Sequence, residues 1–401
     1  MKEPIHISGI GFSSPLGHTW EEHRENFVQK SPLITGIPYY DTSGSAVPFG
    51  GIVRDLDLSL LPKRKLTKLL SHKDRLGVLS ACAASREAKL ADSPIAGHRI
   101  GCYVNTSSSQ FADIFPYFDS VLDCVSADQT HFDSHKFGPL AASRVNPLAA
   151  TKVLLNGALA HICQIFQITG PNQSTMDLEL GTVAIWQEAC RALQAEEVDA
   201  ALVVAIAAPF DPIQLSDKSF AKRLRQWDSG TTLADAKAQL THGNQFQWGL
   251  IPAEGAVTLV LEREDSLKKR RITSLGQVGT PCLDWGLNWT QHEQHEQLKS
   301  LLAAEPLTTL VVAGPEADPT ASQRPALSSL GTCGYMFEAH PLWQLAMGIS
   351  LWHSDSVAHD WFAGQKIPSP LSAIERITAS VSSPIGVGLL PIEKPTQQPE
   401  I

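Results

Sequence analysis

An α/β fold is predicted for this chain of 401 residues from three observations. Short β-branched runs alternate with alanine-rich stretches that are typical of helices. The same alternation recurs in the second half, so two related halves are expected. The run over residues 199–206 is apolar after its first residue, as in strands that are buried on both faces. Together these features favour sheets that are covered by helices on both faces.

The first half is expected to begin with a strand over residues 5–11, followed by a loop over 11–17. A capped helix is expected over 19–30. Residues 74–90 predict a strong amphipathic helix whose alanine-rich face permits close packing. The other elements expected here are a strand over 99–105, helices over 147–168 and 189–195, and the buried strand over 199–206.

The second half repeats the pattern and begins after a polar stretch over residues 210–249, which is interpreted as a long surface loop. We expect an N-terminal half over 1–250, a C-terminal half over 251–395 and a frayed tail over 396–401. The elements expected in the C-terminal half are strands over 256–262, 272–278 and 307–313, a helix over 342–353, and a closing hairpin over 377–382 and 386–392.

Composition excludes several classes of protein. The net charge of −9 argues against a general nucleic-acid binder. No apolar run is long enough to cross a bilayer and the N-terminus lacks a signal-peptide pattern, so a cytoplasmic location is expected. The seven cysteines are scattered without a C-x-x-C pair, which favours reduced thiols over disulfides or zinc. No metal or other cofactor is expected.

Several segments carry a family resemblance, in the right order and at the right spacing. The most specific is Thr-Gly-Pro-Asn-Gln-Ser-Thr-Met-Asp-Leu-Glu over residues 169–179, and its register continues without a gap through 189–199. The segments over 7–17 and 252–262 agree with it. Together they resemble the β-ketoacyl synthases of the thiolase fold. The resemblance implies a thiolase-like αβαβα layered fold made of two pseudo-repeated halves.

The residues needed for condensation are missing at the matching positions. The family uses a cysteine thiolate at a helix N-terminus, two histidines that stabilise an enolate, and a supporting lysine. Here Glu179, eight residues after Pro171, stands at the cysteine position. The corresponding histidine positions hold Ala313 and Tyr335, and the lysine position holds Leu330. The resemblance therefore implies a catalytically inactive member with no catalytic residues of its own.

Inactive members of this family include chain-length factors, which pair with an active ketosynthase and shape its acyl tunnel. We expect this role in type II polyketide or fatty-acid-like synthesis, with acyl carrier protein as an indirect partner. Glutamate rather than glutamine at the nucleophile position favours an aryl polyene system. The tunnel-wall candidates are Phe111, Ile114, Phe115 and Phe118, which recur at helical spacing. An ordinary core or dimer-interface role fits the same spacing.

Other interpretations stay open at this point. The chain is alternatively a malonyl-carrier-protein decarboxylase or an acyltransferase with a site rebuilt on Glu179 and Tyr335, or a homodimeric scaffold. Glu179 either supports the partner's site across the dimer or is simply tolerated at a helix N-terminus, where a negative charge contributes about 0.3–1 kcal/mol. The basic clusters over 62–68 and 218–225 either dock the acidic carrier protein or form ordinary solvated surface.

Overall fold

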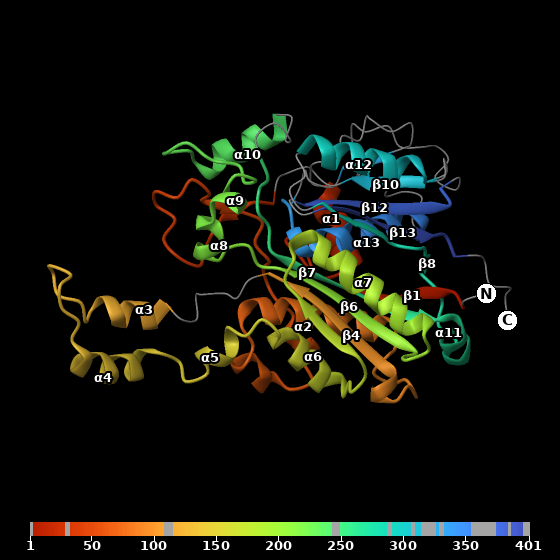
Figure 1. Ribbon diagram of the computed structural model, residues 1–401, viewed down its shortest axis with the longest axis horizontal. Helices are drawn as coiled ribbons and strands as arrows, with labels where there is room; N and C mark the ends of the chain where they lie inside the picture. The colour runs from red at the N-terminus through yellow and green to blue at the C-terminus, as the bar shows by residue number, and fades with distance from the viewer. Residues whose placement is uncertain are drawn as a thin grey trace.

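The computed structural model describes residues 3–28, 33–107, 115–242, 249–286, 291–305, 309–313, 326–328, 333–353, 374–383 and 386–395. Its strands and helices stack as alternating layers in the order helix, sheet, helix, sheet, helix, from α12 at the top of Figure 1 to α2 and α6 at the bottom. This arrangement confirms the predicted α/β class and the layered, thiolase-like architecture.

The first sheet layer contains the strands of the N-terminal half and the first strand of the C-terminal half. Its strands, in spatial order, are β1 (Ile5–Ser13), β7 (Gly255–Arg263), β6 (Ala200–Ala207), β4 (Ile100–Thr106) and β5 (Asn172–Thr175). The pairs β1–β7 and β6–β7 are antiparallel, whereas β4 runs parallel to both β6 and β5. β5 is the last strand of this order, and within the described ranges no strand pairs with its outer edge.

The second sheet layer is built from the C-terminal half. Its strands, in spatial order, are β8 (Gly276–Val278), β13 (Gly386–Glu393), β12 (Arg376–Ser383), β10 (Thr309–Ala313) and β11 (Ala326–Ser328), with β9 (Cys282–Trp285) also paired to β13. The antiparallel pair β12–β13 confirms the predicted closing hairpin. A short pairing of β1 with β8 joins the two layers into one continuous strand order.

Two helices lie between the sheet layers and contribute buried side chains to the apolar core there. They are α7 (Leu178–Gln194) and α13 (His340–His353), and Trp186 and Trp343 are the largest of their fully buried side chains. The outer faces are covered by α2 (His72–Glu87) and α6 (Gly157–Phe166) on one side and α12 (Gln291–Ala303) on the other. Most residues of α7 are therefore buried, whereas Arg191 and Gln194 near its C-terminus are exposed.

Helix α2 shows how the sequence sets a local boundary and a close contact. It begins after Ser71, which forms a capping box with Asp74. Its small residues let β1 approach very closely, because a Cβ atom at Gly11 would overlap the carbonyl oxygen of Ser80. This contact confirms the close packing predicted from the alanine-rich face.

Three predicted elements have different bounds in the structure. The helix expected over 147–168 is divided into α5 (Ala149–Lys152) and α6, because a turn closes from Gly157 N–H to the carbonyl of Leu154. The helix expected over 189–195 is the C-terminal part of the longer α7. The strand expected over 272–278 is reduced to the three residues of β8.

The polar stretch predicted as a surface loop is largely helical. It contains α8 (Pro212–Ser216), α9 (Lys218–Ala221) and α10 (Leu233–His242). The side chains of Phe220, Trp227 and Leu240 are buried in small apolar clusters. These buried apolar side chains, which are spaced among polar residues, pack the segment against the layers beside the N-terminus of α7 (Figure 1). We call residues 210–242 the cap.

A pair of helices lies apart from the layers, at the left of Figure 1. We call this segment the arm; it comprises α3 (Phe115–Leu122), α4 (Ser134–Arg144) and the turn between them. Edge-to-face ring contacts such as Tyr117 with Phe137, at 5.5 Å between centroids, pack the two helices against each other. The remaining elements are α1 (Trp20–Val28), the short pair β2 (Thr35–Gly36) and β3 (Phe49–Gly50), and α11 (Glu264–Arg270).

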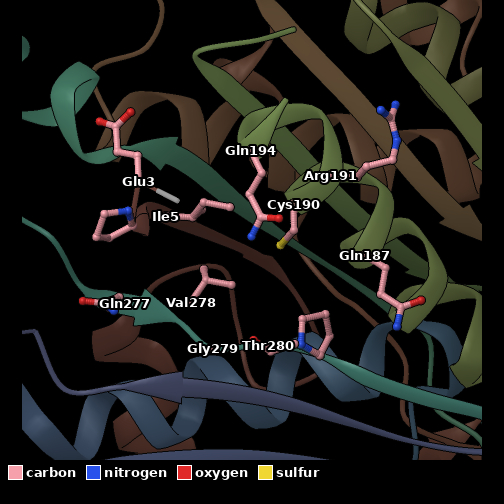
Figure 2. A pocket seen from close by; sticks show the side chains of 12 residues that line it. Glu3, Ile5, Gln187, Cys190, Arg191, Gln194, Gln277, Val278, Gly279 and Thr280 are labelled. Carbon is pink, nitrogen blue, oxygen red and sulfur yellow. The ribbon is translucent and has the colours of Figure 1, made fainter. Parts of the chain in front are cut away.

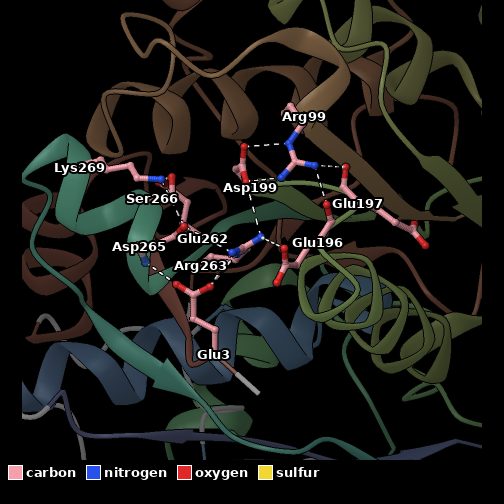
Figure 3. A network of polar contacts seen from close by, with 10 residues as sticks. All are labelled: Glu3, Arg99, Glu196, Glu197, Asp199, Glu262, Arg263, Asp265, Ser266 and Lys269. Carbon is pink, nitrogen blue, oxygen red and sulfur yellow. Dashed lines mark hydrogen bonds and ion pairs between the residues drawn. The ribbon is translucent and has the colours of Figure 1, made fainter. Parts of the chain in front are cut away.

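A network of ion pairs fastens the start of the chain to the ends of the first sheet (Figure 3). Arg263, at the end of β7, lies 2.7 Å from the Glu3 carboxylate and also pairs with Asp265. Arg99 binds Asp199 through two nitrogens, at 2.5 and 2.9 Å. Pairs of this partly exposed kind contribute about 0–1 kcal/mol each. The network is far along α7 from Glu179 and we assign it a structural role.

Candidate functional site

The predicted nucleophile position lies at the N-terminus of the central helix. Glu179 is the second residue of α7, and the preceding Leu178 has a φ of +45°, a strained backbone region for a residue with a side chain. The side-chain amide of Asn105, at the end of β4, donates hydrogen bonds to the Leu178 carbonyl at 2.6 Å and to Thr182 Oγ1 at 2.9 Å. These bonds fix the start of α7 against the sheet.

One glycine makes this approach possible. Gly181 faces Asn105, and a Cβ atom at this position would overlap the Asn105 amide. The Thr182 hydroxyl in turn donates to the carbonyl oxygen of Glu338, at 2.5 Å. The first turn of α7 is thereby tied to β4 on one side and to the segment before α13 on the other.

Glu179 forms an ion pair within its own chain. Its side chain is fully buried, and its Oε1 atom accepts a hydrogen bond from Arg223 Nη2 at 2.5 Å. The Arg223 side chain is 9% exposed. A buried carboxylate needs such a partner, since an isolated charge in the interior is very costly. Two features therefore stabilise the Glu179 carboxylate: the Arg223 guanidinium of the cap and the N-terminus of α7.

Aromatic rings enclose this ion pair. The Arg223 guanidinium lies 5.5 Å from the centroid of the Phe337 ring, which is within cation–π range. Phe337 also contacts the ring of Phe220 on the cap, with 4.8 Å between centroids. Its φ of +29° is unusual for a non-glycine residue and marks a backbone held by its surroundings. The pair is therefore shielded by the segment that precedes α13.

Tyr335 stands at the second predicted histidine position and is also buried. Its ring lies 5.0 Å from that of Phe337 and 4.3 Å from the imidazole of His340. His340 in turn stacks on Trp343, at 5.5 Å. Burial lowers the pKa of His340 to about 3, so its imidazole is neutral near pH 7. The structure therefore links Glu179, Arg223, Phe337 and Tyr335 in one continuous set of contacts.

Two further ionisable groups are buried at this site. Burial raises the pKa of the Glu338 carboxyl to about 8, and the charge of Glu179 acts in the same direction, whereas Arg223 and Lys73 oppose it. Lys73, at the start of α2, is fully buried, and its pKa is lowered, chiefly by burial. Near pH 7 the site therefore holds the Glu179–Arg223 pair beside a largely protonated Glu338.

The structure describes only some of the other predicted site residues. Ala313 is the last residue of β10, and only its backbone position is described. Leu330, Phe111 and Ile114 lie outside the described residues. Of the remaining tunnel-wall candidates, Phe115 is half-buried and Phe118 is 42% exposed, both at the start of the arm.

The basic segment over residues 218–225 points partly inward. Arg223 binds Glu179, and the guanidinium of Arg225 lies 4.1 Å above the ring of Trp227 and donates to Gln239. Lys218 and Lys222 are exposed. The sequence suggested that this cluster either binds the carrier protein or forms solvated surface. Neither interpretation applies to Arg223 and Arg225, whose side chains point into the protein.

The groups that sequence reasoning missed are Arg223 as the partner of Glu179, and the buried pair Lys73 and Glu338. Arg223 is 44 residues from Glu179, so no local spacing indicates the contact. The available signal was chemical: a carboxylate at a buried helix N-terminus requires a cation, and the basic run over 218–225 was the nearest one in the sequence of the same half.

The described residues give little support for other kinds of chemistry. No group of three or more metal-ligating side chains was found among them, and no helix in the described ranges is long and apolar enough to cross a membrane. None of the seven cysteines lies in the first turn of α7. Cys333, close to Tyr335 in sequence, is buried, and burial raises its pKa to about 12, so it is not a thiolate near pH 7.

A hollow of about 350 Å³ lies at the opposite end of α7 (Figure 2). The side chains of Cys190 and Gln194 point from the helix toward Val278, and Ile5 lies at one side. Cys190 lies eleven helical positions after Glu179, which corresponds to roughly 16 Å along the axis. This hollow is therefore separate from the site around Glu179.

Comparison with known proteins identifies the family to which the chain belongs. The family model "Beta-ketoacyl synthase, N-terminal domain" matches residues 2–266, which is more than half of the chain. The chain therefore belongs to the β-ketoacyl synthase family. A curated relative, 3-oxoacyl-[acyl-carrier-protein] synthase 2 of Synechocystis, is 27% identical over 105 residues; this alignment spans 26% of the chain and 25% of the relative.

Solved structures share the fold over the full chain. A β-ketoacyl synthase from Burkholderia phymatum superposes with a TM-score of 0.75 at 15% identity, covering 99% of this chain and 100% of the other. The ishigamide ketosynthase/chain length factor gives a TM-score of 0.71 at 13% identity, with 99% and 100% coverage. A type II polyketide ketosynthase, in complex with its acyl-carrier protein and bound to a hexaketide, gives 0.70 at 13% identity, with 98% and 99% coverage.

Proposed function

We propose that this chain is a non-catalytic, chain-length-factor-like subunit that pairs with an active β-ketoacyl-carrier-protein synthase and shapes its acyl tunnel. The observation that carries the proposal is the buried Glu179–Arg223 ion pair at the position where the family places its thiol. A carboxylate that is neutralised by a guanidinium is a poor nucleophile. Any acyl–carboxylate anhydride that formed there would hydrolyse readily.

The surroundings of Glu179 support the same conclusion. Tyr335 replaces an imidazole at the second histidine position, and it packs among aromatic rings. A phenol supplies one donor, and Ala313 at the other proposed histidine position supplies none, so the site lacks the two donors of the decarboxylation step. The nearby His340 is neutral and stacked between Tyr335 and Trp343. A malonyl-carrier-protein decarboxylase or an acyltransferase built on Glu179 and Tyr335 has less support. The Glu179 carboxylate is already bound by the Arg223 guanidinium.

A partner subunit would cover surfaces that are exposed in the single chain. Large apolar side chains are exposed on the arm, and Leu122 reaches 68% exposure. The other exposed apolar residues of the arm and of the neighbouring segments are Tyr117, Phe118, Phe132, Leu154, Leu155 and Met176. Patches of this kind mark interaction surfaces. The open edge of β5 lies in the segment that leads to α7, and an open edge favours pairing with another strand.

A structural neighbour supports one kind of partner. It is the ishigamide ketosynthase/chain length factor, whose fold this chain shares. We infer that the partner here is an active ketosynthase of the same fold, which would supply the thiol and the two imidazoles. Pairing with a second copy of this chain would leave the dimer with no thiol at either nucleophile position. A homodimeric scaffold is therefore the less favoured assembly.

The tunnel wall and the carrier protein complete the proposal. Phe115 and Phe118 begin the arm, where they would face the partner and limit the length of the acyl chain. The exposed basic cluster at Lys63, Arg64, Lys65 and Lys68 would attract an acidic carrier protein. The structural neighbour with a bound acyl-carrier protein supports such a contact. The proposed product class is a polyketide or fatty-acid-like chain, in the manner of aryl polyenes.

The test compares the chain alone with the chain in its pair. The purified subunit is incubated with malonyl- and acyl-carrier protein, and carbon dioxide release and covalent acylation are measured by mass spectrometry. The subunit alone is expected to be inert, whereas its complex with the ketosynthase condenses the two substrates. Release of carbon dioxide by the subunit alone, at a rate comparable to that of the complex, would favour the decarboxylase instead.

A further inference from the structure

Arg223 occupies the space beside the former nucleophile position. Its guanidinium is 2.5 Å from the Glu179 carboxylate and 5.5 Å from the centroid of Phe337, so it lies between the helix N-terminus and that ring. In an acyl-enzyme intermediate the acyl carbonyl carbon is bonded to the nucleophile, and the chain continues from there. The first atoms of such a chain would coincide with the guanidinium of Arg223.

We propose that Arg223 is a built-in plug, which Glu179 holds in place and which excludes acyl chains from this subunit's own pocket. The inference rests on the proposed function, because it explains why one chain of the pair holds no substrate. In the assembled pair, the growing acyl chain would then be confined to the partner's side of the interface.

The walls around the plug suit an alkyl chain once the charges are removed. Buried apolar side chains next to the pair are Phe220 of the cap and Tyr335 and Phe337 before α13, and the partly buried Leu178 of α7 packs against them. Apolar walls of this kind bind hydrocarbon well. In the native chain the guanidinium fills this space and needs its carboxylate, so the two residues act as a unit.

The experiment measures binding of a fluorescent fatty acid, cis-parinaric acid, to the isolated subunit by titration. The variants are E179A/R223A and E179S/R223S, which remove both charges together and empty the space. The matched control is R225A, because Arg225 is also a buried arginine of the cap but stacks on Trp227 instead of contacting Glu179. Circular dichroism checks that each protein is folded.

The double variants are expected to bind the fatty acid at least tenfold more tightly than the wild type and R225A. A folded double variant that binds no more tightly than the wild type would overturn the proposal. Failure of both double variants to fold, while R225A folds, would overturn it as well, because the pair would then be a structural support and not a plug. No partner subunit is needed, so this result is independent of whether the chain pairs with a ketosynthase.

Discussion

The guanidinium of Arg223 and the carboxylate of Glu179 form a buried ion pair of 2.5 Å at the N-terminus of the central helix. Two parts of the chain that are 44 residues apart meet in this contact. It connects α7, the cap over residues 210–242 and the segment before α13. Because each charge depends on the other for compensation, several consequences can be measured.

The stability of the fold should depend on the pair as a unit. Each single variant, E179L or R223M, leaves one buried charge without its partner and is expected to lose about 3–5 kcal/mol of unfolding free energy. The double variant E179L/R223M is expected to lose less than either one, since hydrophobic residues can replace a buried pair at little cost. Urea denaturation of the four proteins measures this; losses that simply add would show that the two residues do not interact.

Restoring a thiol should not restore catalysis. E179C places a cysteine at the proposed nucleophile position, but in our assignment Ala313 and Tyr335 still stand at the histidine positions, and Arg223 still faces the helix N-terminus. Incubation with acyl-carrier protein followed by intact-protein mass spectrometry is expected to detect no acylated subunit. Acylation at the rate of an active ketosynthase would mean that the assignment of the histidine positions is wrong.

The buried Glu338 carboxyl should make stability depend on pH. Burial raises its pKa from an ordinary 4.5 to about 8, so from pH 4.5 to 8 the folded state keeps a proton that the unfolded chain releases. The unfolding free energy therefore falls as pH rises through this window. E338Q, which mimics the protonated form, is expected to melt within error of the wild type at pH 4.5 and about 2 °C or more above it at pH 8.

The control for this measurement is E296Q, which alters an exposed carboxylate paired with Lys299. Its melting temperature is expected to follow the wild type at every pH. A difference between E338Q and the wild type that stays constant from pH 4.5 to 8 would indicate a packing effect without titration of Glu338.

The tunnel-wall hypothesis makes a steric prediction. In the complex with the ketosynthase, F115A is expected to lengthen the product by one or more two-carbon units, and F115W to shorten it, because a larger ring fills more of the tunnel. F132A, in the turn between α3 and α4, is the control and should leave product length unchanged. Product length is measured by chromatography and mass spectrometry. Unchanged products from intact complexes would mean that Phe115 has only an ordinary packing role.

Most of the fold was predictable because its signals are local. The buried strand β6, the hairpin β12–β13 and the close packing of α2 on β1 follow from apolar runs and small residues in the sequence. The family resemblance implied a helix N-terminus at Glu179, and the structure places Glu179 in the first turn of α7. The break before α6 was not predicted, since the apolar run continues through Leu154 and Leu155, which are exposed in the structure.

The environment of the site was not predictable, because it depends on tertiary contacts. Arg223 and Arg225 belong to a polar segment that is typical of surface loops, yet Arg223 lies against the Phe337 ring from the segment before α13, and Arg225 lies over the ring of Trp227 in its own segment. Lys73 and Glu338 likewise come near each other only in the folded chain. Charge compensation inside a protein leaves no periodic pattern, so only the requirement for a partner could be inferred.

The most direct test of the central claim is co-expression of this chain with the ketosynthase encoded nearest to it, followed by size-exclusion chromatography with light scattering. The account predicts one complex that contains a single copy of each chain and that condenses acyl and malonyl units on carrier protein. Elution of this chain as a homodimer that ignores the ketosynthase, or condensation by this chain alone, would contradict it.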